Sequence, residues 1–132
     1  MEFLRPDDLL ELHAMLLQLY GGGAGLRDEG ALISACLAAE HRAHYEGADA
    51  IACAATYAFH LTNAHAFIDG NKRVAAGACE VFLEINGYDV VASDDALYDR
   101  FMAMSAARMS REVFEAWLRG VVVARDREAS LT

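Results

Sequence analysis

One stretch of the chain, residues 50–68, contains no aspartate, glutamate, lysine or arginine. A charge-free segment of this length belongs either in a membrane or in the interior of a globular domain. Polar side chains recur within it, among them Thr56, His60 and Asn63, and such groups are costly in hydrocarbon. We therefore expect a buried helix from about 49 to 62 that ends in a polar loop, and no membrane-spanning segment.

The other segments also carry helix signals, most of them with a recognisable start or stop. Pro6 suits the first turn of an opening helix, and the run Gly21–Gly23 ends that helix. Asp28, Ser93 and Ser110 can each cap the start of a further helix. Strand signals are poor by comparison, so helices should dominate the fold.

A fourth helix is expected to begin near Asp69 and to end at Asn86-Gly87, a common C-terminal stop. Only residues 88–91 have the pattern of a short extended segment. The sequence thus predicts one all-α domain over residues 1–132, a compact bundle of about six helices, with a polar tail from Arg125 that frays. The stripe expected to face inward on the sixth helix is Val113, Trp117, Leu118, Val121 and Val122.

The formal net charge of −9 and the pI near 4.8 argue against direct nucleic-acid binding, because phosphate backbones are gripped by basic patches. Lys72 is the single lysine, and Lys72-Arg73 is the single pair of adjacent basic residues. A local cationic spot on an acidic protein suggests a small anionic ligand.

Three cysteines, Cys36, Cys53 and Cys79, lie among alanines and leucines and form no C-x-x-C pair. They are expected to be small buried hydrophobic residues in a reducing compartment. The N-terminal residues 1–8 are too charged for a signal peptide. We therefore expect a soluble, cytoplasmic protein.

Between the third and fourth predicted helices lies the segment 65–73, HAFIDGNKR. Asp69 or Asn71 can cap the helix that follows. The free amides and the positive dipole end of a helix start attract anions. Lys72 and Arg73 oppose this dipole, at a cost of roughly 0.3–1 kcal/mol per exposed charge. Their position makes sense when a phosphate group occupies the helix start.

His65 lies just before this helix start, and histidine suits proton transfer near neutrality. Asp69 can hold a magnesium ion that bridges phosphates. Phe67, between them, is expected to face inward and anchor the loop. The competing interpretation is an ordinary capped helix start with an incidental histidine.

The segment 65–73 is similar to the motif H-x-F-x-D-G-N-K-R-T-A of the Fic/Doc family. Residues 83–88 resemble that family's helix ending, and residues 20–28 resemble its first loop, so the resemblance covers roughly residues 3–122. It implies a bundle of about six helices whose active site is the motif loop and the helix start after it.

The residue at position 72 distinguishes two branches of that family. AMP-transferring relatives have glycine where this chain has Lys72, whereas lysine characterises the death-on-curing (Doc) branch. That branch implies a toxin of a toxin–antitoxin system, a protein kinase that moves the terminal phosphate of ATP, with Mg²⁺, to a threonine or serine of a protein. The implied target is elongation factor Tu, whose modification stops translation, and the implied partner is an antitoxin that covers the site.

The resemblance also implies a role for each motif residue. His65 would take the proton from the acceptor hydroxyl, and Asp69 would orient His65 or hold the metal ion, two roles that stay open. Phe67 would be structural. The residues implied to bind the nucleotide phosphates are Gly70, Asn71, Lys72 and Arg73.

The chain departs from the family pattern at two positions. Val74 replaces the usual threonine, and Ala66 replaces a frequent proline, so a loop contact is expected to be weaker. The self-inhibitory motif S/T-x-x-x-E-G/N of some Fic enzymes is missing, so inhibition should come from a separate protein. Two alternatives remain: AMP transfer by the same fold, and a nucleotide-binding or interaction module without catalysis.

The remaining histidines carry weaker signals. His13 is expected to be a partly buried helix residue, and His60 should not share a face with His65. His41 and His44 lie near the end of the second predicted helix, where they could flank a target-binding edge. A metal site at these two is disfavoured because no third ligand is evident.

Overall fold

The computed structural model describes residues 1–125, which form six α-helices and one short antiparallel β-ribbon. This confirms the all-α prediction. Of the polar tail predicted from Arg125, only Arg125 is described: its side chain donates to the carbonyl oxygens of Glu84 and Tyr88, and residues 126–132 lie outside the described residues. In chain order the elements are α1 (Pro6–Tyr20), α2 (Glu29–Glu46), α3 (Ala50–Ala64), α4 (Asn71–Ile85), β1 (Tyr88–Val90), α5 (Asp94–Ser105), α6 (Arg111–Arg119) and β2 (Val122–Ala124).

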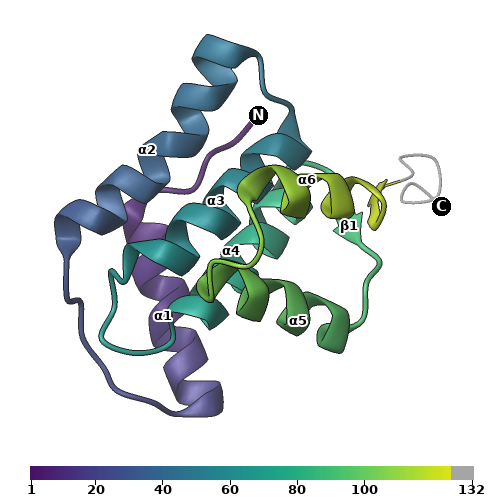
Figure 1. Ribbon diagram of the computed structural model, residues 1–132. Helices are drawn as coiled ribbons and strands as arrows, with labels where there is room; N and C mark the ends of the chain where they lie inside the picture. The colour runs from purple at the N-terminus through teal and green to yellow at the C-terminus, as the bar shows by residue number, and fades with distance from the viewer. Residues whose placement is uncertain (126–132) are drawn as a thin grey trace, which may run out of the picture.

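Helices α3 and α4 form the centre of the bundle, with α1 and α2 on one side and α5 and α6 on the other (Figure 1). Helix α3 is buried along nearly its whole length, including Thr56 and Tyr57, as expected for the charge-free stretch. Alanine and cysteine allow the close approach of its neighbours. In the part of the chain that the structure describes, no helix is both long and apolar enough to cross a membrane.

Three of the predicted capping residues are confirmed. The side chains of Asp28, Ser93 and Ser110 each accept a hydrogen bond from the amide three residues later, at 3.0–3.2 Å. Asp49 does the same at the start of α3, at 2.9 Å. Such caps satisfy amides that have no partner within the helix.

The predicted end of the sixth helix is wrong. Helix α6 ends at Arg119, and Val122 lies in β2, paired with Val90 of β1. The run of β-branched residues 121–123 follows Gly120 and favours an extended ribbon over another helical turn. Leu118 is buried as predicted, but Val113 is 55% exposed, and the other buried side chain of α6 is Phe114.

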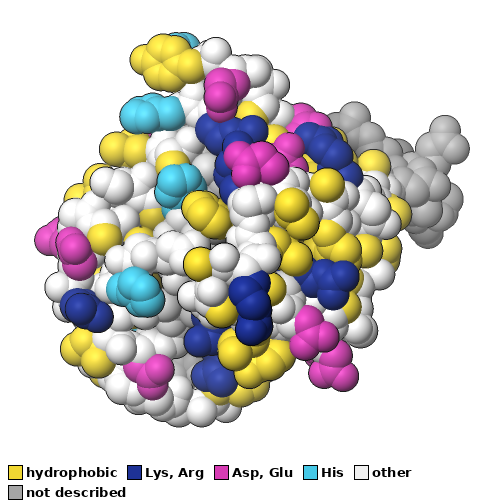
Figure 2. All heavy atoms as spheres, viewed as in Figure 1, with side chains coloured by type: hydrophobic (Ala, Val, Ile, Leu, Met, Phe, Trp, Pro, Cys, Tyr) yellow, Lys and Arg dark blue, Asp and Glu magenta, His cyan; other side chains and the backbone are white. Residues whose placement is uncertain are grey.

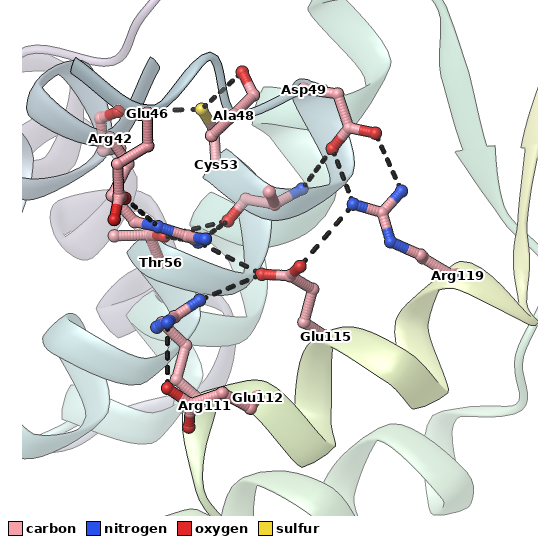
Figure 3. A network of polar contacts seen from close by, with 12 residues as sticks. Arg42, Glu46, Ala48, Asp49, Cys53, Thr56, Arg111, Glu112, Glu115 and Arg119 are labelled. Atoms are coloured by element: carbon pink, nitrogen blue, oxygen red, sulfur yellow. Dashed lines mark hydrogen bonds and ion pairs between the residues drawn. The ribbon is translucent and has the colours of Figure 1, made fainter. Parts of the chain in front are cut away.

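A network of charged side chains fastens α6 to α2 and to the start of α3 (Figure 3). Arg119 makes two hydrogen bonds to the carboxylate of Asp49, at 2.7 and 2.9 Å. Glu115, on the same helix, accepts from Arg42 and from Arg111, at 3.1 and 3.0 Å. This network lies at the N-terminal end of α3, whereas the motif follows its C-terminal end.

The three cysteines are buried and unbonded, one each on α2, α3 and α4, as predicted. Burial raises the pKa of the Cys36 thiol and that of the Cys53 thiol, each to about 11. Cys79, fully enclosed, has its thiol pKa raised further for the same reason. These thiols are therefore protonated at neutral pH.

Candidate active site

The motif occupies the loop between α3 and α4, and the loop between α1 and α2 holds it in place. The carbonyl oxygen of Ala66 accepts two backbone hydrogen bonds from that second loop, at 2.7 and 3.0 Å. The amide of Ile68 donates a third to the carbonyl oxygen of Gly25, at 3.1 Å. Two segments far apart in sequence, 20–28 and 65–70, thus form one structural unit.

Phe67 faces inward, as predicted, and only 2% of its surface is exposed. Its backbone is held by the side chain of Asn71: Oδ1 accepts from the Phe67 amide at 3.0 Å, and Nδ2 donates to the Phe67 carbonyl oxygen at 2.9 Å. The Asn71 side chain therefore shapes the loop. Its backbone amide, the first of α4, has no partner within the helix and is the part of Asn71 that can meet an anion.

The prediction that Asp69 or Asn71 caps α4 is wrong. The residue before the helix is Gly70, at φ 83°, and no side chain caps the first turn. The reason is that both candidate side chains bind elsewhere, Asn71 to the peptide of Phe67 and Asp69 to loop amides. Uncapped amides at a helix start can attract an anion.

The exposed carboxylate of Asp69 accepts two backbone amides, from Gly23 at 3.1 Å and from Gly70 at 2.8 Å. These amides, Gly23 foremost, hold the pKa of Asp69 below its usual range, so the group is ionised at neutral pH. A Cβ atom at Gly22 would lie 2.8 Å from Asp69 Oδ2, and Gly22 has φ 119°, so glycine is required there. Within residues 1–125, His65 is not among the hydrogen-bond partners of this carboxylate.

His65 is the last residue of the α3 helix end and is exposed to solvent. Its backbone is left-handed, at φ 51° and ψ 41°, a conformation that is unfavourable for residues with a side chain. Glycine is the usual residue at such a helix end. A histidine in a strained position next to a candidate site suggests that its side chain serves a function.

Lys72 and Arg73 are exposed in the first turn of α4, with the charges that the dipole disfavours. The ion pairs of residues 1–125 involve other arginines, and neither of these two side chains has a carboxylate partner there. The Arg73 guanidinium lies over the ring of Tyr20, 4.5 Å from its centre. Such a cation–π contact holds the arginine near the site while its charge stays available.

Sequence reasoning missed His13, which belongs to the site's support. It lies on α1, is only 6% exposed, and its Nε2 donates to the carbonyl oxygen of Asp69 at 2.9 Å. Its ring stacks on Phe67 with 4.0 Å between the ring centres. No local pattern around His13 signals these contacts, because α1 meets the motif loop only in the folded protein.

A metal site made by protein groups alone is not found among the described residues: no cluster of three His, Cys, Asp or Glu side chains could hold an ion. On the face drawn in Figure 2 the histidines are scattered, and basic side chains intermingle with acidic ones in its upper part.

The two departures from the family motif, Val74 and Ala66, are both buried in the core.

These features define a helical bundle with an uncapped helix start, suited to an anion, beside an exposed histidine. The chain belongs to the Fic/DOC family, whose family model matches residues 3–83. Among individual proteins, it is similar to the protein kinase doc of Escherichia phage P1. The two are 32% identical over 96 residues, which cover 72% of this chain and 76% of the phage protein.

Proposed function

We propose that this protein is a Doc-type toxin that transfers the terminal phosphate of ATP to a hydroxyl group of a protein. The observation that carries the proposal is the pair Lys72 and Arg73, exposed and without carboxylate partners in residues 1–125, on the uncapped start of α4. Phosphate is the anion that such a cluster of backbone amides, lysine and arginine binds best. Similarity to a protein kinase supports the same choice.

In the proposed reaction the phosphates lie against the first amides of α4, with Lys72 and Arg73 neutralising their charge. The acceptor hydroxyl loses its proton to His65, and its oxygen attacks the terminal phosphorus. The bond from that phosphorus to the bridging oxygen breaks, and ADP leaves with the electron pair. Phosphoryl transfer depends mainly on such positioning and charge stabilisation, so few side chains suffice.

The residues present fit a magnesium ion bound together with the nucleotide. Asp69 offers an ionised, exposed carboxylate, and magnesium commonly takes one or two carboxylates, phosphate oxygens and water. When bound, the ion would neutralise charge on the phosphates. The amides of Gly23 and Gly70 hold the Asp69 carboxylate in place before the ion arrives.

The acceptor we propose is a threonine or serine of elongation factor Tu, so that the modification stops translation. The regulator we propose is a separate antitoxin protein that covers the site. An amphipathic helix of that partner would lie in an apolar groove near the motif, a common mode of recognition. Exposed apolar side chains near the site, Tyr20 and Ile68, fit such a contact.

The experiment that tests the proposal uses ATP labelled at either the terminal or the innermost phosphate. The purified protein is incubated with each, with Mg²⁺ and elongation factor Tu or a bacterial lysate. Label transferred only from the terminal phosphate is the expected result. Transfer from the innermost phosphate would mean AMP transfer instead, and transfer from neither would mean a module without catalysis.

Two histidine variants complete this experiment. Replacing His65 by alanine should lower the transfer rate by about 10²–10⁴-fold, the usual loss when a general base is removed. Replacing His60 by alanine is the matched control, because it removes an exposed histidine from α3 five residues earlier. Activity of the His65 variant within a few-fold of the parent would remove His65 from the mechanism.

A further inference from the structure

The peptide that joins Asp69 to Gly70 has two orientations open to it. Gly70 lies at φ 83°, and glycine occupies positive and negative φ about equally well. Rotation of this peptide by half a turn would therefore meet little steric resistance at Gly70. Something other than backbone sterics must select the orientation that the structure shows.

In the observed orientation, the carbonyl of this peptide faces His13. A carbonyl oxygen carries no proton, so His13 Nε2 is the donor to the oxygen of Asp69, at 2.9 Å. In a trans peptide the carbonyl and the next amide point in opposite directions, and residues 1–125 contain no cis peptide. With its carbonyl turned toward His13, the peptide must point the Gly70 amide away from α1. There the amide meets Asp69 Oδ1, at 2.8 Å.

His13 is itself held firmly, as a positioning group must be. Its side chain is buried, and its ring lies nearly parallel to that of Phe67, with 15° between the two planes. Phe67 in turn is fixed by both groups of the Asn71 side-chain amide. The donor therefore reaches Asp69 from a buried side chain of helix α1, across 56 residues of sequence.

We propose that His13 is a positioning residue of the active site: its Nε2–H sets the peptide between Asp69 and Gly70. Through that peptide it sets the direction of the Gly70 amide and the place of the Asp69 carboxylate. The link to catalysis rests on the proposed phosphotransferase function. The link to the loop's geometry rests on the contacts alone.

Two substitutions at this position separate hydrogen bonding from packing. His13→Phe keeps an aromatic ring against Phe67 but removes the donor, whereas His13→Gln removes the ring but keeps an N–H donor at a similar reach. If His13 acts as a donor, the Gln variant resembles the parent and the Phe variant does not. If it only fills space, the order is reversed. His60→Phe, at an exposed position of α3, makes the same chemical change outside the loop.

The first measurement is the amide proton resonance of Gly70 and its rate of hydrogen exchange, which need no activity. In His13→Phe we expect the Gly70 amide resonance to shift upfield and its hydrogen exchange to become about tenfold faster. A change of that size corresponds to the loss of roughly one hydrogen bond by this amide. Amides in the middle of α4 should not change. His13→Gln and His60→Phe should keep the parent's signal.

The second measurement is the rate of phosphate transfer by fully folded protein. For His13→Phe, kcat should fall by about tenfold, while KM for ATP stays within about twofold, because Lys72 and Arg73 still hold the phosphates. The Gln variant should recover most of kcat. An unchanged Gly70 resonance in His13→Phe, or a Gln variant no better than Phe in either measurement, would overturn the proposal. If the parent protein transfers no phosphate, the proposed function fails, and the Gly70 resonance alone decides the role of His13.

Discussion

Replacing His65 by glycine should make the protein more stable and at the same time inactive. His65 ends α3 in the left-handed region, at φ 51° and ψ 41°. That conformation costs a residue with a side chain about 1–2 kcal/mol, with histidine among the residues that adopt it more often. Glycine removes the cost but adds about 0.5–1 kcal/mol of chain entropy to be lost on folding.

The net expectation is a gain of about 0.5–1 kcal/mol in the free energy of unfolding. For a chain of this length such a gain raises the melting temperature by roughly 2–4 °C. The His65 side chain is exposed, so its loss removes little packing that would offset the gain. The transfer rate, measured with terminally labelled ATP, should fall by about 10²–10⁴-fold.

A matched control is available at Ala107, the other non-glycine residue with positive φ in the described part of the chain. Its φ is 58°, and it follows α5, outside the motif loop. Ala107→Gly should raise stability by a similar amount and leave the transfer rate unchanged. A His65→Gly variant that is less stable than His65→Ala, or that still transfers phosphate, would refute the reasoning.

Three further predictions concern charge and regulation. Replacing Lys72 and Arg73 by alanine should weaken ATP binding, measured by calorimetry. The nucleotide-free protein should be as stable or slightly more stable, because charges that oppose the α4 dipole are gone. Equal ATP affinity in the double variant would rule out the phosphate site. Burial, and then the charges of Glu84 and Asp94, raise the pKa of Glu80, so its ionised form disfavours folding at pH 7. Glu80→Gln should therefore increase the free energy of unfolding at pH 7, measured in denaturant, and this gain should vanish below about pH 4, where the unfolded chain also holds the proton. Expression of the protein alone should arrest bacterial growth, and co-expression of its antitoxin should restore growth; harmless expression of folded protein would contradict the toxin proposal.

The elements of the fold could be predicted because their signals are local. The caps Asp28, Ser93 and Ser110 act on amides three residues away, and the burial of α3 follows from its own lack of charge. The inward position of Phe67 was predictable for the same reason. The ribbon partner β2 was missed because Val122 can continue a helical stripe as well as a strand, and its pairing with β1 depends on chain far away.

The support of the candidate site could not be predicted, since it consists of contacts between distant segments. His13 reaches Asp69 from α1, and Gly23 donates to the same residue from the following loop. Tyr20, which lies against Arg73, looks in the sequence like an ordinary residue at the end of a helix. The motif suggests which groups carry chemistry, but only the tertiary structure identifies what holds them.

The buried thiols give this protein an internal reporter of its own opening. Only the thiolate reacts with alkylating reagents, and burial keeps all three cysteines protonated and covered at neutral pH. Because one buried thiol lies on each of α2, α3 and α4, alkylation of a cysteine requires the helix that carries it to separate from its neighbours, locally or completely. The rate of alkylation at each cysteine would thus report how often its helix opens. A bound nucleotide or antitoxin that stabilises the folded state would lower that rate.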